Sequence, residues 1–274
     1  MSIYICADDI GQDPAINDGC LELFYLGRIS QVSVLSLAPH VKSYHLPLIN
    51  AHAKGLQIGL HFNLTLAFPD AVYVQPLSRL MFLSQLRLLD LPKIRDSFLQ
   101  QINTFIDIFG FLPDFIDGHQ HVHQFPQIRD VLIECLLNTY NNRSAVWVRS
   151  TVLPSPHADL PHTLKCHLLN ILGGNHFLTT LSTHSIPHNH GFLGVYDFAP
   201  HSVPAYQSLM QRWLSLANEQ SLIMCHPASK KVFNDAIGAQ RPIEFNYLKS
   251  DLFLEDLRVA KLAVGKPVSN ELRN

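Results

Sequence analysis

Residues 117–123 read DGHQHVH, so that one aspartate and three histidines stand at alternate positions. Imidazole is the commonest metal ligand in proteins, and side chains at alternate positions of a β-strand share one face. A strand that continued through this segment would therefore gather its histidines on one side. The alternative, a merely polar and solvated strand face, gives no reason for three histidines in seven residues. The segment indicates a metal site.

Further polar side chains stand where other predicted strands end. They are Asp8 and Asp9 after the strand Ile3–Ala7, His61 near the end of Gln57–Leu64, Arg149 at the end of Ala145–Arg149, and His226 after Leu222–Cys225. Barrel enzymes gather their catalytic groups at the carboxyl ends of the strands. Taken alone, His61 is as well explained as a core residue, and one of the two aspartates as a helix cap. The joint pattern favours an active site, in which the adjacent aspartates need two roles because neighbours on a strand face opposite ways.

Short β-rich runs alternate with helical stretches, which favours a parallel sheet or barrel in a single domain, residues 1–274. A further strand is predicted over Gln31–Leu37, and a strand that begins at Phe115 runs into the histidines. Helices are predicted over Ala15–Leu26, Val41–Lys54, Ile94–Phe109, Gln127–Tyr140, Ala205–Glu219 and Leu252–Ala263. Residues 67–89 read as irregular. Residues 154–204, rich in Pro, His and Gly, read as a long inserted loop region of the kind that binds substrate or covers a site.

Composition narrows the class of protein. Hydrophobic residues make up 47% of the 274 residues and charged residues 15%, so the chain can bury a large core. A net charge of −2 leaves no basic stripe for nucleic acid or an anionic membrane. The five cysteines are odd in number and never spaced as CxxC, which argues against a disulfide framework or a thiolate zinc site. We expect reduced thiols, a cytoplasmic location and no transmembrane segment. A homo-oligomer is left open.

Five motifs carry a family resemblance. In order they are ICADDIG, IGLHFNLT, FIDGHQHVHQFPQI, IMCHPA and RPIEFNYLKSDLF. Together they resemble the YdjC-like family of carbohydrate deacetylases, which includes chitooligosaccharide and hopanoid-biosynthesis-associated deacetylases, over nearly the whole chain. The resemblance implies a distorted (β/α) TIM-like barrel. It also implies metal-dependent removal of an acetyl group from an N-acetylated saccharide or glycolipid. Ile10, Gly118 and Gln120 depart from the residues common in the family, which leaves the identity of the sugar open.

The resemblance also implies roles for individual residues. Asp9, His61 and His119 match the ligands of one divalent metal ion, Mg²⁺ or Zn²⁺. Asp8 matches the catalytic base and His226 a general acid. Chemistry, and not the resemblance, suggests four further residues that orient these groups or contact substrate. They are Asp117, His121 and His123, because ligating histidines need an orienting partner, and Arg149, for which an ion pair that keeps Asp8 ionised and a structural salt bridge are both open.

Only one histidine of DGHQHVH is expected to bind the metal. Along a strand, each two-residue step covers roughly 6.5 Å, so His123 would lie too far from a metal that His119 binds at about 2.0–2.1 Å. His121 is nearer to His119 along the chain and is therefore the alternative candidate for this metal ligand.

Two other classes of protein remain compatible with these residues. Two histidines and one carboxylate also form the Fe(II) site of non-haem oxygenases. A histidine-rich, non-catalytic metal-binding protein is the third reading, and it gives Asp8 and His226 no role.

Overall fold

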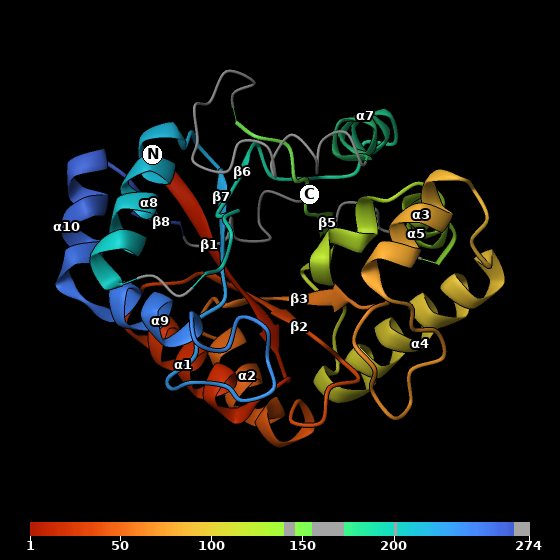
Figure 1. Cartoon of the computed structure of the whole chain (residues 1–274), viewed down its shortest axis with the longest axis horizontal. Helices are drawn as coiled ribbons and strands as arrows, with labels where there is room; N and C mark the ends of the chain where they lie inside the picture. The colour runs from red at the N-terminus through yellow and green to blue at the C-terminus, as the bar shows by residue number, and fades with distance from the viewer. Residues whose placement is uncertain (140–145, 155–172, 200–201, 266–274) are drawn as a thin grey trace.

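The computed structural model describes residues 1–139, 146–154, 173–199 and 202–265, and its centre is a curled parallel sheet that forms a half-barrel (Figure 1). Its strands are β1 (Ser2–Ile10), β2 (Gln31–Val34), β3 (Gln57–Phe62), β4 (Phe115–Gly118), β5 (Trp147–Val148), β6 (Phe192–Leu193), β7 (Leu222–Cys225) and β8 (Ala263–Val264). They follow the order β5-β4-β3-β2-β1-β7-β6, and β8 pairs with β1. This half-barrel is consistent with the distorted TIM-like barrel expected from the sequence.

Strand β1 lies at the centre of the sheet, where it pairs in parallel with β2, β7 and β8. Its side chains Ile3 and Ile5 are fully buried, as are Val32 on β2 and Ile223 on β7. A parallel sheet is covered on both faces, so its strands read as nearly continuous apolar runs. The polar residues that follow these runs are therefore brought to one end of the sheet.

Helices cover the sheet on its outer side, with α8 to α10 on one side of Figure 1 and α3 to α5 on the other. The α-helices are α1 (Pro14–Tyr25), α2 (His45–His52), α3 (Leu77–Gln85), α4 (Leu91–Phe109), α5 (Ile128–Thr139), α7 (Asn175–Thr183), α8 (Val203–Leu216), α9 (Arg241–Lys249) and α10 (Asp251–Ala260), and the 3₁₀-helices are η1 (Lys42–Tyr44) and η2 (His119–Gln124). Helix α4 matches its prediction because its signals are local. Asp90 caps its first turn and Gly110, at φ 78°, ends it. Within the described residues, every helix is too short or too polar to cross a membrane.

Several elements differ from the sequence predictions. Residues 67–89 contain α3, and the single helix expected at the carboxyl end is preceded by a second, α9. An extended residue, Ser250, separates α9 from α10. Val41–Lys54 divides into η1 and α2. In the inserted region, residues 173–199 contain α7 and β6. Residues 155–172 and 200–201, which include four histidines of this region, lie outside the described residues. Residues 140–145, where a helix was predicted to end and a strand to begin, also lie outside them.

A glycine on β3 allows close contact between β3 and β4. A methyl group at Gly59 would lie 2.3–2.5 Å from three ring carbons of Phe115. We predict that Gly59→Ala lowers the free energy of unfolding by about 1–3 kcal/mol, because the ring has to move in a packed core. Urea denaturation measures the loss. Phe115→Leu removes the clashing ring, so the double variant should lose less than the sum of the two single losses; strictly additive losses would contradict this explanation.

Candidate active site

A cavity of about 610 Å³ lies at the carboxyl ends of the central strands. Its polar lining includes Asp8, Asp9, His61, His119, His121 and His226. Its apolar lining includes Leu77 and Met81 of α3, Phe125 directly after η2, and Val195 and Phe198 after β6. The structure thus brings six of the nine residues selected from the sequence to one cavity wall. The other three, Asp117, His123 and Arg149, are fully buried behind them.

The end of β1 departs from regular strand geometry. The pairing of β1 with β2 shifts register between Ala7 and Ile10, and Asp9 has φ 70°. A left-handed backbone is uncommon for a residue other than glycine and costs on the order of 1–3 kcal/mol. Because of this irregularity, Asp8 and Asp9 line the same cavity rather than opposite faces. Neither caps the next helix, since Asp13 accepts the hydrogen bond from the backbone N–H of Ala15 at 2.8 Å.

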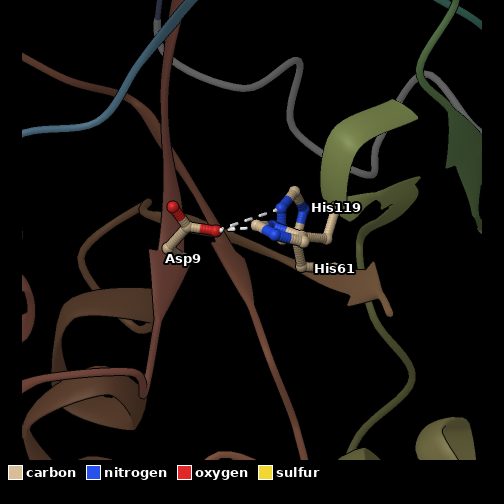
Figure 2. A group of neighbouring side chains, drawn as sticks. All are labelled: Asp9, His61 and His119. Atoms are coloured by element: carbon tan, nitrogen blue, oxygen red, sulfur yellow. Dashed lines mark hydrogen bonds and ion pairs between the residues drawn. The ribbon is translucent and has the colours of Figure 1, made fainter. Parts of the chain in front are cut away.

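Asp9, His61 and His119 converge from β1, β3 and η2. Asp9 Oδ1 lies 3.0 Å from His119 Nδ1 and 3.4 Å from His61 Nε2. Figure 2 shows both imidazole rings pointing toward the Asp9 carboxylate. One candidate ligand atom from each of the three residues lies within 4.8 Å of the others. Two of the three residues lie on strands of the sheet, and His119 directly follows a third strand, β4.

His61 is oriented by Asp117 and Ser33 behind it. Asp117 Oδ1 lies 2.6 Å from His61 Nδ1 and accepts a hydrogen bond from Ser33 Oγ at 2.5 Å. Because a carboxylate only accepts, Nδ1 carries the hydrogen and Nε2 faces Asp9. Burial alone would lower the pKa of His61, whereas Asp117 and Asp8 raise it to about 10. A metal ion at Nε2 would therefore have to displace a proton.

The donors of Asp9, His61 and His119 fit a divalent metal ion. Two imidazole nitrogens and one carboxylate oxygen form a three-ligand set of the type found in catalytic zinc sites, which leave a position for water. Mg²⁺ prefers an all-oxygen environment. This donor set therefore favours Zn²⁺ over Mg²⁺.

A second cluster, Cys6, Asp8 and Asp117, contains the Arg149 guanidinium. Arg149 donates to both oxygens of Asp8 at 2.7 Å, and its Nη2 lies 2.5 Å from Asp117 Oδ2 and 2.9 Å from Cys6 Sγ. The guanidinium already supplies the positive charge that these groups need, so the cluster is a poor candidate for a metal. The ion pair between Arg149 and Asp8 that the sequence suggested is present.

The strand does not continue through DGHQHVH, and that expectation was wrong. Strand β4 ends at Gly118, and η2 begins at His119. Inside η2, Gln120 and His121 have left-handed φ values of 52° and 59°. The backbone coils here, so the alternate-position spacing used to rank the histidines does not apply.

The three histidines of this segment face three different surroundings. His119 faces Asp9, His121 lines the cavity with its ring edge-on to Phe192, and His123 points into the core. There His123 Nε2 donates to the Arg149 carbonyl oxygen at 2.9 Å. His123 is thereby separated from the cavity, although for a different reason from the one inferred from the sequence.

His226 lies on the cavity wall directly after β7. Its ring packs edge-on against the Phe198 ring, with the ring centroids 5.0 Å apart. Its backbone N–H donates to Glu244 Oε2 at 2.7 Å. Burial lowers the pKa of His226, and the nearby carboxylates of Asp9 and Asp8 oppose that shift. The side chain is therefore held in place through its own backbone and is set among negative charges.

Two buried residues of α9 were missed by the sequence analysis. Arg241 donates to Asp9 Oδ2 at 2.7 Å, and Glu244 accepts from His226 and from the Tyr196 hydroxyl. Burial would lower the pKa of Arg241, but Asp9 and Asp235 raise it. The available signal was the motif RPIEFNYL, in which an arginine and a glutamate three positions apart accompany the apolar residues that a core-facing helix buries.

Comparisons with known proteins indicate the family of this chain. A family model described as YdjC-like protein matches residues 2–259. The human carbohydrate deacetylase is 30% identical over 167 residues, which cover 56% of this chain and 49% of that protein. The chitooligosaccharide deacetylase of Proteus mirabilis is 30% identical over 139 residues, 48% of this chain and 54% of that protein. The chain therefore spans about half the length of the curated relatives it matches.

Solved structures share the fold at lower identity. A protein of Enterococcus faecalis V583 named for cellobiose-phosphate cleavage superposes with a TM-score of 0.67 and 21% identity, over 97% of both chains. A peptidoglycan N-acetylglucosamine deacetylase superposes with a TM-score of 0.53 and 11% identity, over 96% of this chain and 85% of the other. These similarities show a common fold.

His123 should make the folded protein sensitive to acid. Burial lowers its pKa to about 4, against about 6.5 in an unfolded chain. Between these values the unfolded chain binds a proton that the folded protein does not, so the free energy of unfolding falls as pH falls, by up to about 1.4 kcal/mol per pH unit. We predict a shallower dependence for His123→Gln in urea denaturation at pH 7 and pH 5. An unchanged dependence would show that His123 already titrates normally in the folded protein.

Proposed function

Because the chain belongs to the YdjC-like family, we propose that it is a metal-dependent hydrolase that removes the acetyl group from an N-acetylated sugar and releases acetate and a free amine. Its relatives named carbohydrate deacetylase and chitooligosaccharide deacetylase support this reaction. The observation that carries the proposal is that Asp9, His61 and His119 converge on a cavity that Asp8 and His226 also line.

Asp9, His61 and His119 would hold one divalent metal ion, for which the donor set favours Zn²⁺. Such an ion lowers the pKa of a bound water and polarises the acetyl carbonyl. Asp117 and Ser33 keep the His61 ring turned so that Nε2 faces Asp9. Partners of this kind fix the tautomer and direction of a ligand.

Asp8 is the proposed base. It lines the cavity next to Asp9, and both of its oxygens accept hydrogen bonds from Arg149. Oδ1 also accepts a hydrogen bond from the Cys6 thiol at 3.6 Å, whereas Oδ2 has a second lone pair with which Asp8 can take a proton from the attacking water. Arg149 positions the carboxylate and compensates the charge that Asp8 carries in the interior.

His226 is the proposed acid. Amide nitrogen is a poor leaving group, so the departing sugar amine needs a proton, and a positioned acid contributes roughly 10²–10⁴-fold. The hydrogen bond from its backbone to Glu244 fixes where the His226 ring enters the cavity. Burial lowers the pKa of His226, and the carboxylates of Asp9 and Asp8 offset part of this shift in favour of the imidazolium that donates the proton.

The cavity suits a sugar. A volume of about 610 Å³ lies within the usual range for small-molecule sites. Polar groups occupy one side, and Met81, Phe125 and Phe198 provide apolar surface for the C–H faces of a sugar ring or for the apolar part of a glycolipid. His121, whose ring also faces this cavity, is placed to contact substrate hydroxyl groups.

The direct test is acetate release from N-acetylated monosaccharides, oligosaccharides and glycolipid analogues, with zinc-reconstituted protein under nitrogen. We expect one acetate for each free amine, loss of activity with a chelator and recovery with added Zn²⁺. Full activity of metal-free protein, or turnover that requires oxygen, would contradict the proposal. The second outcome would favour an Fe(II) oxygenase.

Removing the base should separate catalysis from metal binding. Asp8→Asn preserves the shape of the side chain but cannot accept the proton, so turnover should fall by about 10²–10⁴-fold while zinc content stays at the wild-type level. Steady-state kinetics and elemental analysis of the same preparation measure both. If zinc content falls in parallel with turnover, Asp8 is a ligand and the division of roles between Asp8 and Asp9 is wrong.

Substitution of the three histidines of DGHQHVH should change zinc binding to different extents. His119→Ala removes one of three ligands, so bound zinc should fall by at least about tenfold after gel filtration, as expected for the loss of a direct ligand. His121→Ala should retain zinc and lose substrate affinity, and His123→Gln should retain zinc with normal KM. Loss of zinc in His121→Ala with retention in His119→Ala would show that His121, and not His119, is the metal ligand.

A further inference from the structure

We infer that Arg241 acts as a permanent counterion of Asp9. Arg241 thereby stabilises the metal-free protein, weakens metal binding and leaves only one oxygen of Asp9 for the metal. The inference rests on the proposed function, because it takes Asp9 as a metal ligand. It assigns Arg241 a positioning role that acts through Asp9.

The two oxygens of Asp9 face different partners. Oδ1 faces the imidazoles of His119 and His61, at 3.0 Å and 3.4 Å. Oδ2 accepts a hydrogen bond from Arg241 Nη2 at 2.7 Å. A carboxylate that is held in this way offers one oxygen to a metal that the two histidines bind.

Arg241 is fixed so that it cannot leave Asp9 easily. It is 1% exposed, its Nε pairs with Asp235, and its Nη1 lies 3.4 Å from the His226 carbonyl oxygen. Asp235 is itself held by the loop before α9, because its Oδ1 accepts from the Ile237 backbone N–H. The guanidinium therefore has three anchors and a set direction.

The charges explain why this contact affects metal binding. Asp9 is 1% exposed, and a buried carboxylate without a partner is strongly destabilising. Arg241 supplies positive charge to Asp9 whether or not a dication is bound. Once a dication binds, the two cations share one carboxylate and repel each other. Arg241 thus favours the metal-free protein over the metal-bound protein.

Holding one oxygen of Asp9 also serves the chemistry. A carboxylate that bound through both oxygens would occupy a further coordination position. Catalytic sites need that position for water or substrate. The inference therefore predicts that loss of Arg241 gives tighter metal binding and slower turnover, a combination that a purely structural ion pair does not produce.

The test is zinc titration of the metal-free protein together with thermal unfolding in the absence and presence of Zn²⁺. We expect Arg241→Met to lower the Tm of metal-free protein, to bind Zn²⁺ about tenfold or more tightly than wild type, and to gain a larger Tm increase on zinc binding. Turnover should fall despite the tighter binding. Arg241→Lys, which keeps the charge, should return zinc affinity toward the wild-type value.

A second variant covers the case in which Arg241→Met fails to fold. Arg241→Gln can still donate a hydrogen bond to Asp9 but carries no charge, and it should also bind Zn²⁺ more tightly than wild type. Arg129→Met is the matched control. It removes another buried arginine, 5% exposed, which pairs with Asp130 and bonds the Gln124 carbonyl, so stability should fall without a change in zinc affinity.

Two failures can be told apart. Zinc binding by the uncharged Arg241 variants that is equal to or weaker than wild type would overturn the counterion role. Wild-type protein that binds no zinc, or binds it equally well in Asp9→Asn, would instead overturn the proposed metal site.

Discussion

The pairing of buried carboxylates with two buried arginines is the interaction on which the candidate site depends. Asp8, Asp9 and Asp117 lie at the carboxyl ends of β1 and β4 with almost no exposure to solvent. Carboxylates brought so close together repel each other and lose their hydration. Arg149 compensates Asp8 and Asp117 from behind, and Arg241 compensates Asp9 from the side. These pairs allow a dense group of acids to line a cavity in the folded protein.

The same charges divide the site into two parts. Around Arg149, the guanidinium binds both oxygens of Asp8 and contacts Asp117, so this part is already neutralised. In the part around Asp9, the carboxylate oxygen that Arg241 does not bind faces His61 and His119. We propose that the first part holds the base and the second the metal. Backbone irregularity makes this division possible, because the left-handed φ of Asp9 turns two adjacent carboxylates toward one cavity.

The sequence predicted the parts of the site that follow from strand ends. Apolar runs marked the strands, and in parallel strands whatever follows the run reaches the same edge; this placed Asp8, Asp9, His61 and His226 at one cavity. Local signals likewise predicted α4. What failed depends on tertiary contacts or on rare backbone conformations. The left-handed residues Gln120 and His121, which end the strand reading of DGHQHVH, carry no propensity signal. Arg241 was missed because its partner Asp9 lies 232 positions away in the chain.

The central claim is that the metal lies between Asp9, His61 and His119. Anomalous diffraction from a crystal of the zinc-loaded protein, measured on both sides of the zinc absorption edge, tests it directly. We expect one strong anomalous peak within about 2.0–2.2 Å of one Asp9 oxygen and one nitrogen from each histidine, with Arg241 still bound to the other Asp9 oxygen. A peak at His121 and His226, or one bound by Asp8 in place of Asp9, would contradict it.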